Sequence, residues 1–135
     1  MRIPDYIVDE VAADEQRELA RREVMYRGHR APPEVRGRIV ILVDDGLATG
    51  STMRAAERAL RQQGPALLIV AVPTAARETC AAFAGEVDEI ICAMTPEPFY
   101  AVGLWYENFL QTSDEKVRAL LESAARGFNP PGHET

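Results

Sequence analysis

The sequence is short of lysine, of cysteine and of long apolar runs, and each shortage excludes a class of protein. Lys116 is the only lysine among the 135 residues, and its place in an expected C-terminal helix leaves no Gly-Lys-Ser/Thr signature of a P-loop. No apolar run approaches the roughly 20 residues of a membrane-spanning helix, and the N-terminus is charged, unlike a signal sequence. Cys80 and Cys92 lack metal-ligand spacing and lie in apolar surroundings. We therefore expect reduced core cysteines, and neither zinc ligands nor a disulfide.

A basic excess is also absent, because 15 basic residues face 21 acidic ones and give a net charge of −6. A general nucleic-acid-binding protein normally carries a basic face, so we expect no nucleic-acid partner. All the basic residues except Lys116 are arginines, whose side chains suit phosphate clamping. With 47% hydrophobic residues the chain can bury a core, since domains of this size hide about two-thirds of their unfolded surface. We expect one cytoplasmic domain.

The most informative segment is residues 40–52, which read VILVDDGLATGST. The apolar run 39–43 is mostly β-branched, and a continuous run of this kind is typical of a central strand covered on both faces. Asp44 and Asp45 then lie at the carboxyl end of that strand, where open α/β sheets bind ligands.

The residues after the two aspartates are small or hydroxylated and favour an anion. They open an expected helix over 51–63, whose unpaired first-turn amides and positive dipole end attract a phosphate. Two carboxylates would repel a phosphate that they touched, so we expect them to hold neutral hydroxyls or a divalent cation nearby. The pattern therefore predicts a sugar phosphate. The expected phosphate loop consists of Gly46, Leu47, Ala48, Thr49, Gly50, Ser51 and Thr52.

Two other interpretations of this segment compete with a sugar-phosphate site. A response-regulator receiver also begins with a strand ending in two aspartates, but its phosphoacceptor aspartate and its lysine are not placed correctly here. The simplest alternative is a pair of aspartates that cap a turn in an ordinary α/β domain.

The segment resembles the phosphoribosyl pyrophosphate (PRPP) motif of type I phosphoribosyltransferases. The resemblance implies that Asp44 and Asp45 bind the ribose 2′ and 3′ hydroxyls and that residues 47–52 wrap the 5′-phosphate. The downstream stretches AVPTAARETC and TPEPFYAVGLWYENF further resemble bacterial members of the family whose base is not established by sequence. The likeness covers nearly the whole chain.

The rest of the chain alternates helices and strands, which predicts right-handed crossovers and a parallel sheet. We expect a domain over 1–127, made of an N-terminal helix (1–28), a motif-bearing core (38–94) and a C-terminal segment (95–127), followed by a disordered tail (128–135). Within it we expect a loop over 26–36, strands over 66–72 and 87–93, a helix from a Thr74 cap to 84, a short helix within 95–111, and a last helix from Thr112 or Ser113 to 125.

Only three strands are visible, whereas the family core that the motif resembles has more, with a pyrophosphate-binding loop upstream of the motif. No segment before residue 38 matches that strand or loop. The fold class is therefore an α/β parallel sheet with flanking helices, similar to type I phosphoribosyltransferases but without the N-terminal strand or strands. The motif strand would lie at an exposed edge, so we favour a homodimer that pairs through this strand or through the first helix.

If the chain is catalytic, the resemblance implies displacement of pyrophosphate from PRPP by a nitrogenous base, with Mg²⁺ offsetting charge near Asp44 and Asp45. The two aspartates would orient the ribose ring. Ala48 replaces the acid that acts on the base in hypoxanthine-type relatives, so no general base is assigned. Arg27 and Arg30 are candidate pyrophosphate contacts or simply solvated loop cations.

The candidates for a base pocket follow the second and third strands. They are Pro73, Thr74, Thr95, Phe99 and Trp105. An aromatic side chain could stack on the base, but Phe99, Val102, Trp105, Tyr106 and Phe109 recur at helical spacing, which more often indicates core or dimer contact. His29 and His133 have no partner that suggests chemistry.

Two functions remain open. The first is a PRPP-dependent transferase. The second is a non-catalytic PRPP- or nucleotide-binding module, or a truncated paralogue that acts with a partner chain.

Overall fold

The computed structural model describes residues 4–28 and 30–127, except for the side chain of Val8. Contacts divide the chain into two compact units, one made of the residues up to Pro32 and from Leu110 onwards, the other of Pro33–Phe109. The expected tail (128–135), His29 and His133 lie outside the described residues. The assignment of a single domain over 1–127 stays a prediction.

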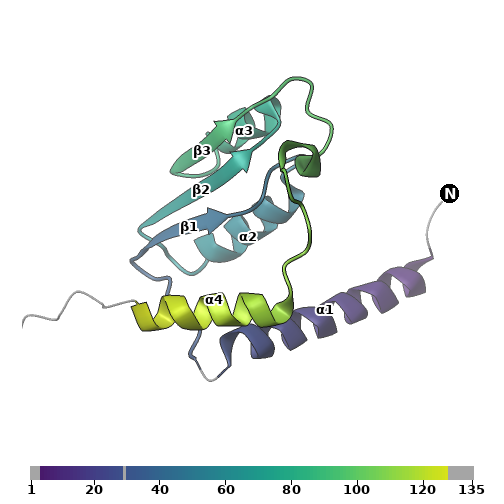
Figure 1. Cartoon of the computed structure of the whole chain (residues 1–135), viewed down its shortest axis with the longest axis vertical. Coiled ribbons are helices and arrows are strands. Elements are labelled where there is room, and N and C mark those ends of the chain that lie inside the picture. The colour runs from purple at the N-terminus through teal and green to yellow at the C-terminus, as the bar shows by residue number, and fades with distance from the viewer. Residues whose placement is uncertain (1–3, 29, 128–135) are drawn as a thin grey trace, which may run out of the picture. The chain divides into compact units, whose positions relative to one another are not determined.

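The second unit is an α/β unit whose first strand leads into the motif (Figure 1). Its elements are β1 (Ile39–Val43), α2 (Ser51–Arg61), β2 (Leu67–Thr74), α3 (Arg77–Phe83), β3 (Glu89–Met94) and the 3₁₀ helix η1 (Val102–Trp105). The three strands form a parallel sheet in the order β1-β2-β3, with Ile41 of β1 opposite Ile69 of β2. The expected fold class is confirmed.

One face of the sheet carries the hydrophobic core, on the side where α2 and α3 pack (Figure 1). Apolar side chains that alternate along a strand point to one face of the sheet, and in β2 these are Leu68, Val70 and Val72, all buried. The other buried core residues are Leu47, Met53, Ala75, Phe83 and Val87. Burial of this face holds the start of α2 against the end of the sheet.

Within the α/β unit, no described residue covers the opposite face of β1. Ile39, Ile41 and Val43 are 62%, 58% and 73% exposed, whereas Val40 and Leu42 pack against the core. The expectation that this strand is covered on both faces is therefore wrong. A continuous apolar run does not distinguish a central strand from an edge strand with one open apolar face. The expected exposed edge is present.

Thr74 does not cap a helix as expected, because strand-like pairing continues past it. The main-chain amide of Leu47 donates to the Thr74 carbonyl at 3.0 Å, and the Ala76 amide donates to the Leu47 carbonyl at 2.9 Å. α3 therefore begins only at Arg77, after Ala76. The Thr74 hydroxyl is buried and has no hydrogen-bond partner among the described atoms.

Cys80 of α3 and Cys92 of β3 are joined in a disulfide, with their Cα atoms 6.7 Å apart. The expectation of two reduced cysteines is therefore wrong. Both residues pack against the core face, and this closeness arises from the packing of α3 on β3, which sequence spacing does not reveal. Among the described residues, no helix is both long and apolar enough to cross a membrane.

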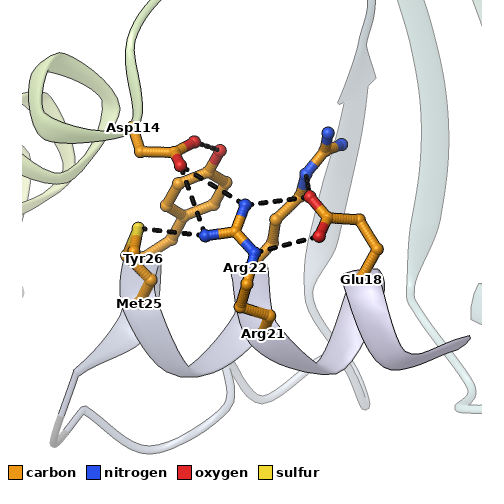
Figure 2. Close-up of polar contacts among 6 residues, drawn as sticks. All are labelled: Glu18, Arg21, Arg22, Met25, Tyr26 and Asp114. Carbon is orange, nitrogen blue, oxygen red and sulfur yellow. Dashed lines mark hydrogen bonds and ion pairs between the residues drawn. The ribbon is translucent and has the colours of Figure 1, made fainter. Parts of the chain in front are cut away.

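The other unit pairs two helices, α1 (Asp5–Arg27) and α4 (Asp114–Gly127). The Tyr26 hydroxyl donates to Asp114 Oδ1 at 2.6 Å, and Arg21 bridges Asp114 and Glu18 (Figure 2). The hydrogen bond from Arg21 is the main cause that lowers the pKa of Glu18 to about 2. Ser113 accepts a hydrogen bond from the Lys116 amide at 3.2 Å, which confirms the expected start of α4.

Candidate phosphate-binding site

The site begins with a turn that directly follows β1. Asp44 and Asp45 are exposed residues, although the Asp45 carboxyl is itself partly buried. The Asp45 amide donates to Asp44 Oδ1 at 2.8 Å. The predicted strand bounds are confirmed, since β1 ends at Val43. The two carboxylates therefore leave the sheet at its carboxyl end, where parallel sheets present ligand-binding groups.

The loop after the aspartates is held to the next strand. Leu47 is buried and forms an isolated parallel bridge with Ala75, beyond the last paired residues of β1. Both hydrogen bonds of that bridge, to the Thr74 carbonyl and from the Ala76 amide, are main-chain bonds. The loop conformation is thus set by the backbone, as pre-organised anion binding requires.

Two glycines allow the loop to fit. A Cβ atom on Gly46 would lie 2.7 Å from Val102 Cγ1 and 3.0 Å from the Thr74 carbonyl oxygen. Gly50 has a φ of +78°, and its Cβ would lie 2.6 Å from Phe83 Cε2. Gly50 is the residue before α2, so its left-handed backbone sets the direction in which the helix leaves the loop.

Hydroxyls and side chains complete the loop. Thr49 Oγ1 and Ser51 Oγ are 3.1 Å apart, and Thr79 of α3 donates to the Ala48 carbonyl at 2.6 Å. Arg54 donates to the Thr49 carbonyl at 2.9 Å. The Ser51 amide donates to Thr49 Oγ1 at 3.4 Å, so the amides of Thr52 and Met53 are the first-turn groups of α2 that can face an anion.

A cavity of about 180 Å³ lies against this loop. Its lining consists of Asp44, Gly46, Leu47, Ala48, Thr49, Gly50, Ser51, Thr52, Met53 and Val102. Within the part of the chain that the structure describes, no arginine, lysine or histidine lines it. The cavity is therefore built from helix amides, hydroxyls and one carboxylate, a set that suits a phosphate with a hydroxylated group attached.

The carboxylates are electrostatically coupled. Partial burial, followed by the influence of the neighbouring Asp44 carboxyl, raises the pKa of Asp45. The described residues hold no group of three or more histidine, cysteine, aspartate or glutamate side chains placed to bind a metal ion. Two adjacent carboxylates suit a Mg²⁺ ion that arrives with phosphate oxygens of its own, since Mg²⁺ commonly takes only one or two protein carboxylates in phosphate sites.

Four contributors to the loop were missed by sequence reasoning, or were considered only for other roles. Thr79 and Arg54 bind loop carbonyls, Val102 lines the cavity, and the Tyr106 hydroxyl donates to the Asp45 carbonyl. Their only sequence signal is that Val102 and Tyr106 belong to the aromatic segment after β3, where we expected base or core contacts.

The remaining candidates lie elsewhere. Arg27 and Arg30 belong to the α1–α4 unit, where they line a separate cavity with Arg118 and Arg126. Arg30 donates to the Tyr26 carbonyl at 2.7 Å and to the Leu121 carbonyl at 2.8 Å. Their role in pyrophosphate binding stays a prediction.

The base-pocket candidates belong to the α/β unit, but none is among the residues that line the phosphate-loop cavity. Thr74 is buried, Thr95 and Phe99 are half-buried, and Pro73 and Trp105 are exposed. Their role in base binding stays a prediction.

Fold and site together define an α/β protein with a candidate phosphate-binding loop at the carboxyl end of a parallel sheet. Residues 4–91 match the family described as "Phosphoribosyl transferase domain". The chain belongs to that family, as the motif in residues 40–52 predicted.

Similar proteins and a solved structure support this family assignment. The protein named "Putative phosphoribosyl transferase Rv0571c" from Mycobacterium tuberculosis H37Rv is 42% identical over 125 residues, which cover 93% of this chain and 28% of that protein. Its counterpart MT0597 from strain CDC 1551 matches equally. The chain thus spans less than a third of the length of these two curated relatives. The crystal structure of TT1426 from Thermus thermophilus superposes with a TM-score of 0.75 and 36% identity, over 90% of this chain and 58% of that one.

Proposed function

We propose that the chain binds PRPP together with Mg²⁺, and that the protein transfers the 5-phosphoribosyl group to a nitrogenous base. In this reaction the bond between ribose carbon 1 and a pyrophosphate oxygen breaks, a bond from carbon 1 to a base nitrogen forms, and pyrophosphate and a proton are released. The observation that carries the proposal is the cavity at which an acidic turn meets the amides and hydroxyls of a helix start.

The cavity lining, together with Asp45 next to it in the turn, has a role in each part of this proposal. The amides at the start of α2 and the hydroxyls of Thr49, Ser51 and Thr52 bind the 5′-phosphate, because a helix N-terminus favours negative charge. Asp44 and Asp45 accept hydrogen bonds from the ribose hydroxyls and so orient the ring. Mg²⁺, when bound, offsets negative charge on the leaving pyrophosphate.

The test is calorimetric titration with PRPP in the presence of Mg²⁺. The wild-type protein should bind, and the double variant Asp44→Asn, Asp45→Asn should bind more weakly, because each substitution removes a charged acceptor worth about 1.5–3 kcal/mol. Glu89→Gln, an exposed position in the same unit and outside the cavity lining, is the control. No binding by the wild type, or equal binding by the double variant, refutes the proposal.

A second candidate is a non-catalytic PRPP- or nucleotide-binding module that acts with a partner chain. It is favoured by the absence of a basic side chain from the described cavity lining, because a leaving pyrophosphate needs compensating positive charge. Pyrophosphate release in the presence of a panel of purine and pyrimidine bases separates the two candidates. Binding of PRPP without release of pyrophosphate with every base tested supports the binding module. Release of pyrophosphate with any one base supports the transferase.

For the expected homodimer, we propose that a second copy covers the open edge of β1. Antiparallel pairing centred on Ile41 sets Ile39 opposite Val43 and the exposed Arg38 opposite Asp44 of the second copy. Apolar residues then meet apolar residues and a cation meets an anion, so the edge is self-complementary. The pairing also delivers an arginine to the vicinity of the acidic turn.

A further inference from the structure

The segment that follows β3 contacts the acidic turn from a distant part of the chain. The Tyr106 hydroxyl donates a hydrogen bond to the main-chain carbonyl of Asp45, across 61 positions of sequence. Four residues before Tyr106, Val102 lies over Gly46 and lines the cavity. The segment of η1 therefore forms a wall of the site and also fixes the backbone from which the carboxylates project.

Tyr106 is itself held in place by aromatic packing. Its ring lies 5.2 Å from the Phe109 ring, centroid to centroid, with 41° between their planes. A Cβ atom on Gly103 would lie 2.7 Å from Phe109 Cδ1, so a glycine in η1 is what lets Phe109 approach. A phenol backed by a second ring has little freedom to turn away from its acceptor.

The hydroxyl also keeps its proton. Partial burial raises the pKa of Tyr106, and the negative charges of Asp45 and Asp44 raise it further. Tyr106 is therefore a hydrogen-bond donor at neutral pH, and a carbonyl oxygen is a fixed acceptor for it. The bond holds the peptide between Asp45 and Gly46 in one orientation.

We propose that Tyr106 is a positioning residue that fixes the Asp44–Asp45 turn and thereby sets the preference of the site for a sugar phosphate with two adjacent hydroxyls. The inference rests on the proposed function, in which the two carboxylates bind the ribose diol. With the Asp45 carbonyl held, the two carboxylates keep one spacing, and a ligand that lacks one hydroxyl leaves a charged acceptor without its partner. The phosphate loop from Leu47 onwards does not depend on this bond, because main-chain bonds with Thr74 and Ala76 hold Leu47.

The test compares ribose 5-phosphate, 2-deoxyribose 5-phosphate and inorganic phosphate by titration calorimetry, with Mg²⁺ present. The wild type should prefer the ribose over the deoxyribose compound about tenfold or more, since hydrogen bonds to charged groups are worth the most. In Tyr106→Phe this preference should fall by about three- to tenfold. Affinity for inorganic phosphate should stay within about twofold of the wild type, because the phosphate loop is unchanged.

The matched control is Tyr100→Phe, because Tyr100 lies in the same segment, is 77% exposed and is not among the residues that line the cavity. It should retain the full preference for ribose. The inference is overturned if Tyr106→Phe keeps the wild-type preference for the ribose compound, or if it loses affinity for all three ligands equally. Either result leaves the proposed function intact. Failure of the wild-type protein to bind any sugar phosphate overturns the proposed function and the inference with it.

If a thermal melt shows that Tyr106→Phe does not fold, the same three ligands are compared on a protein with 3,5-difluorotyrosine at position 106. The fluorinated phenol keeps the ring and the hydrogen bond near neutral pH but ionises in mildly alkaline solution, where it no longer donates. Selectivity for ribose should then fall as the pH rises, while phosphate affinity follows that of the wild type. Unchanged selectivity across that pH range overturns the inference.

Discussion

Replacing Gly50 with alanine tests whether the phosphate loop is held by its contact with the core. Gly50 has a φ of +78°, and an added Cβ would lie 2.6 Å from Phe83 Cε2 and 3.1 Å from Thr79 Cγ2. A left-handed backbone costs a non-glycine residue about 1–2 kcal/mol, and overpacking a well-packed core costs about 1–3 kcal/mol. Phe83 is fully buried, so its ring can make room only by displacing other core residues. We expect the free energy of unfolding to fall by about 2–5 kcal/mol.

Urea unfolding followed by circular dichroism measures this loss, and Gly37→Ala is the matched control. Gly37 also has a left-handed backbone, with a φ of +71°, but nothing lies within 4 Å of its added Cβ. It should lose only the backbone cost, about 1–2 kcal/mol. Equal losses in the two variants would refute the reasoning, because the contact with Phe83 would then carry no cost.

Three further outcomes follow from the charges and the open edge. Asp45→Asn should raise the free energy of unfolding at pH 7, because the raised pKa of Asp45 means that folding disfavours its ionised form. Urea unfolding at a series of pH values measures this gain in stability. The gain should vanish below about pH 4, where Asp45 is protonated even in the unfolded chain. Asp88→Asn should instead lower the free energy of unfolding at pH 7. The Leu68 amide donates to Asp88 at 2.7 Å and lowers the pKa of Asp88 in the folded protein. The greater stability of the wild type should be present above about pH 4 and be lost as the pH falls through that folded pKa. Ile41→Lys should convert a dimer to a monomer in light scattering, whereas Ile91→Lys, on the other edge strand, should not; a wild-type chain that is already monomeric contradicts the dimer.

The motif could be predicted closely because its information is local. A β-branched run ends at Val43, two aspartates follow, and a glycine with left-handed backbone precedes the helix that starts at Ser51. Each of these signals acts over a few residues, and neighbouring signals agree with one another. The strand end, the loop and the helix start were therefore found in the right places.

The supports of the loop could not be predicted, because they come from distant segments. Thr79 is 31 positions from the carbonyl that it binds, and Tyr106 is 61 positions from its acceptor. No local pattern records which side chain reaches a given carbonyl, since tertiary packing decides it. The same reason explains the disulfide between Cys80 and Cys92, whose spacing of 12 residues has no meaning until α3 packs on β3.

Features that oppose folding gather at one loop of the α/β unit. Gly50 holds a left-handed backbone against the Phe83 ring, Gly46 is crowded by Val102 and by a carbonyl oxygen, and the pKa of Asp45 is raised by partial burial and by Asp44. Strain and unfavourable charge persist where the surrounding structure enforces them, and such places are commonly ligand sites. A hydroxylated ligand would give Asp44 and Asp45 the hydrogen-bond donors that relieve their repulsion, so ligand binding should stabilise the wild type more than Asp45→Asn. A larger ligand-induced rise in melting temperature for the variant would show that the acidic turn serves the fold and not the ligand.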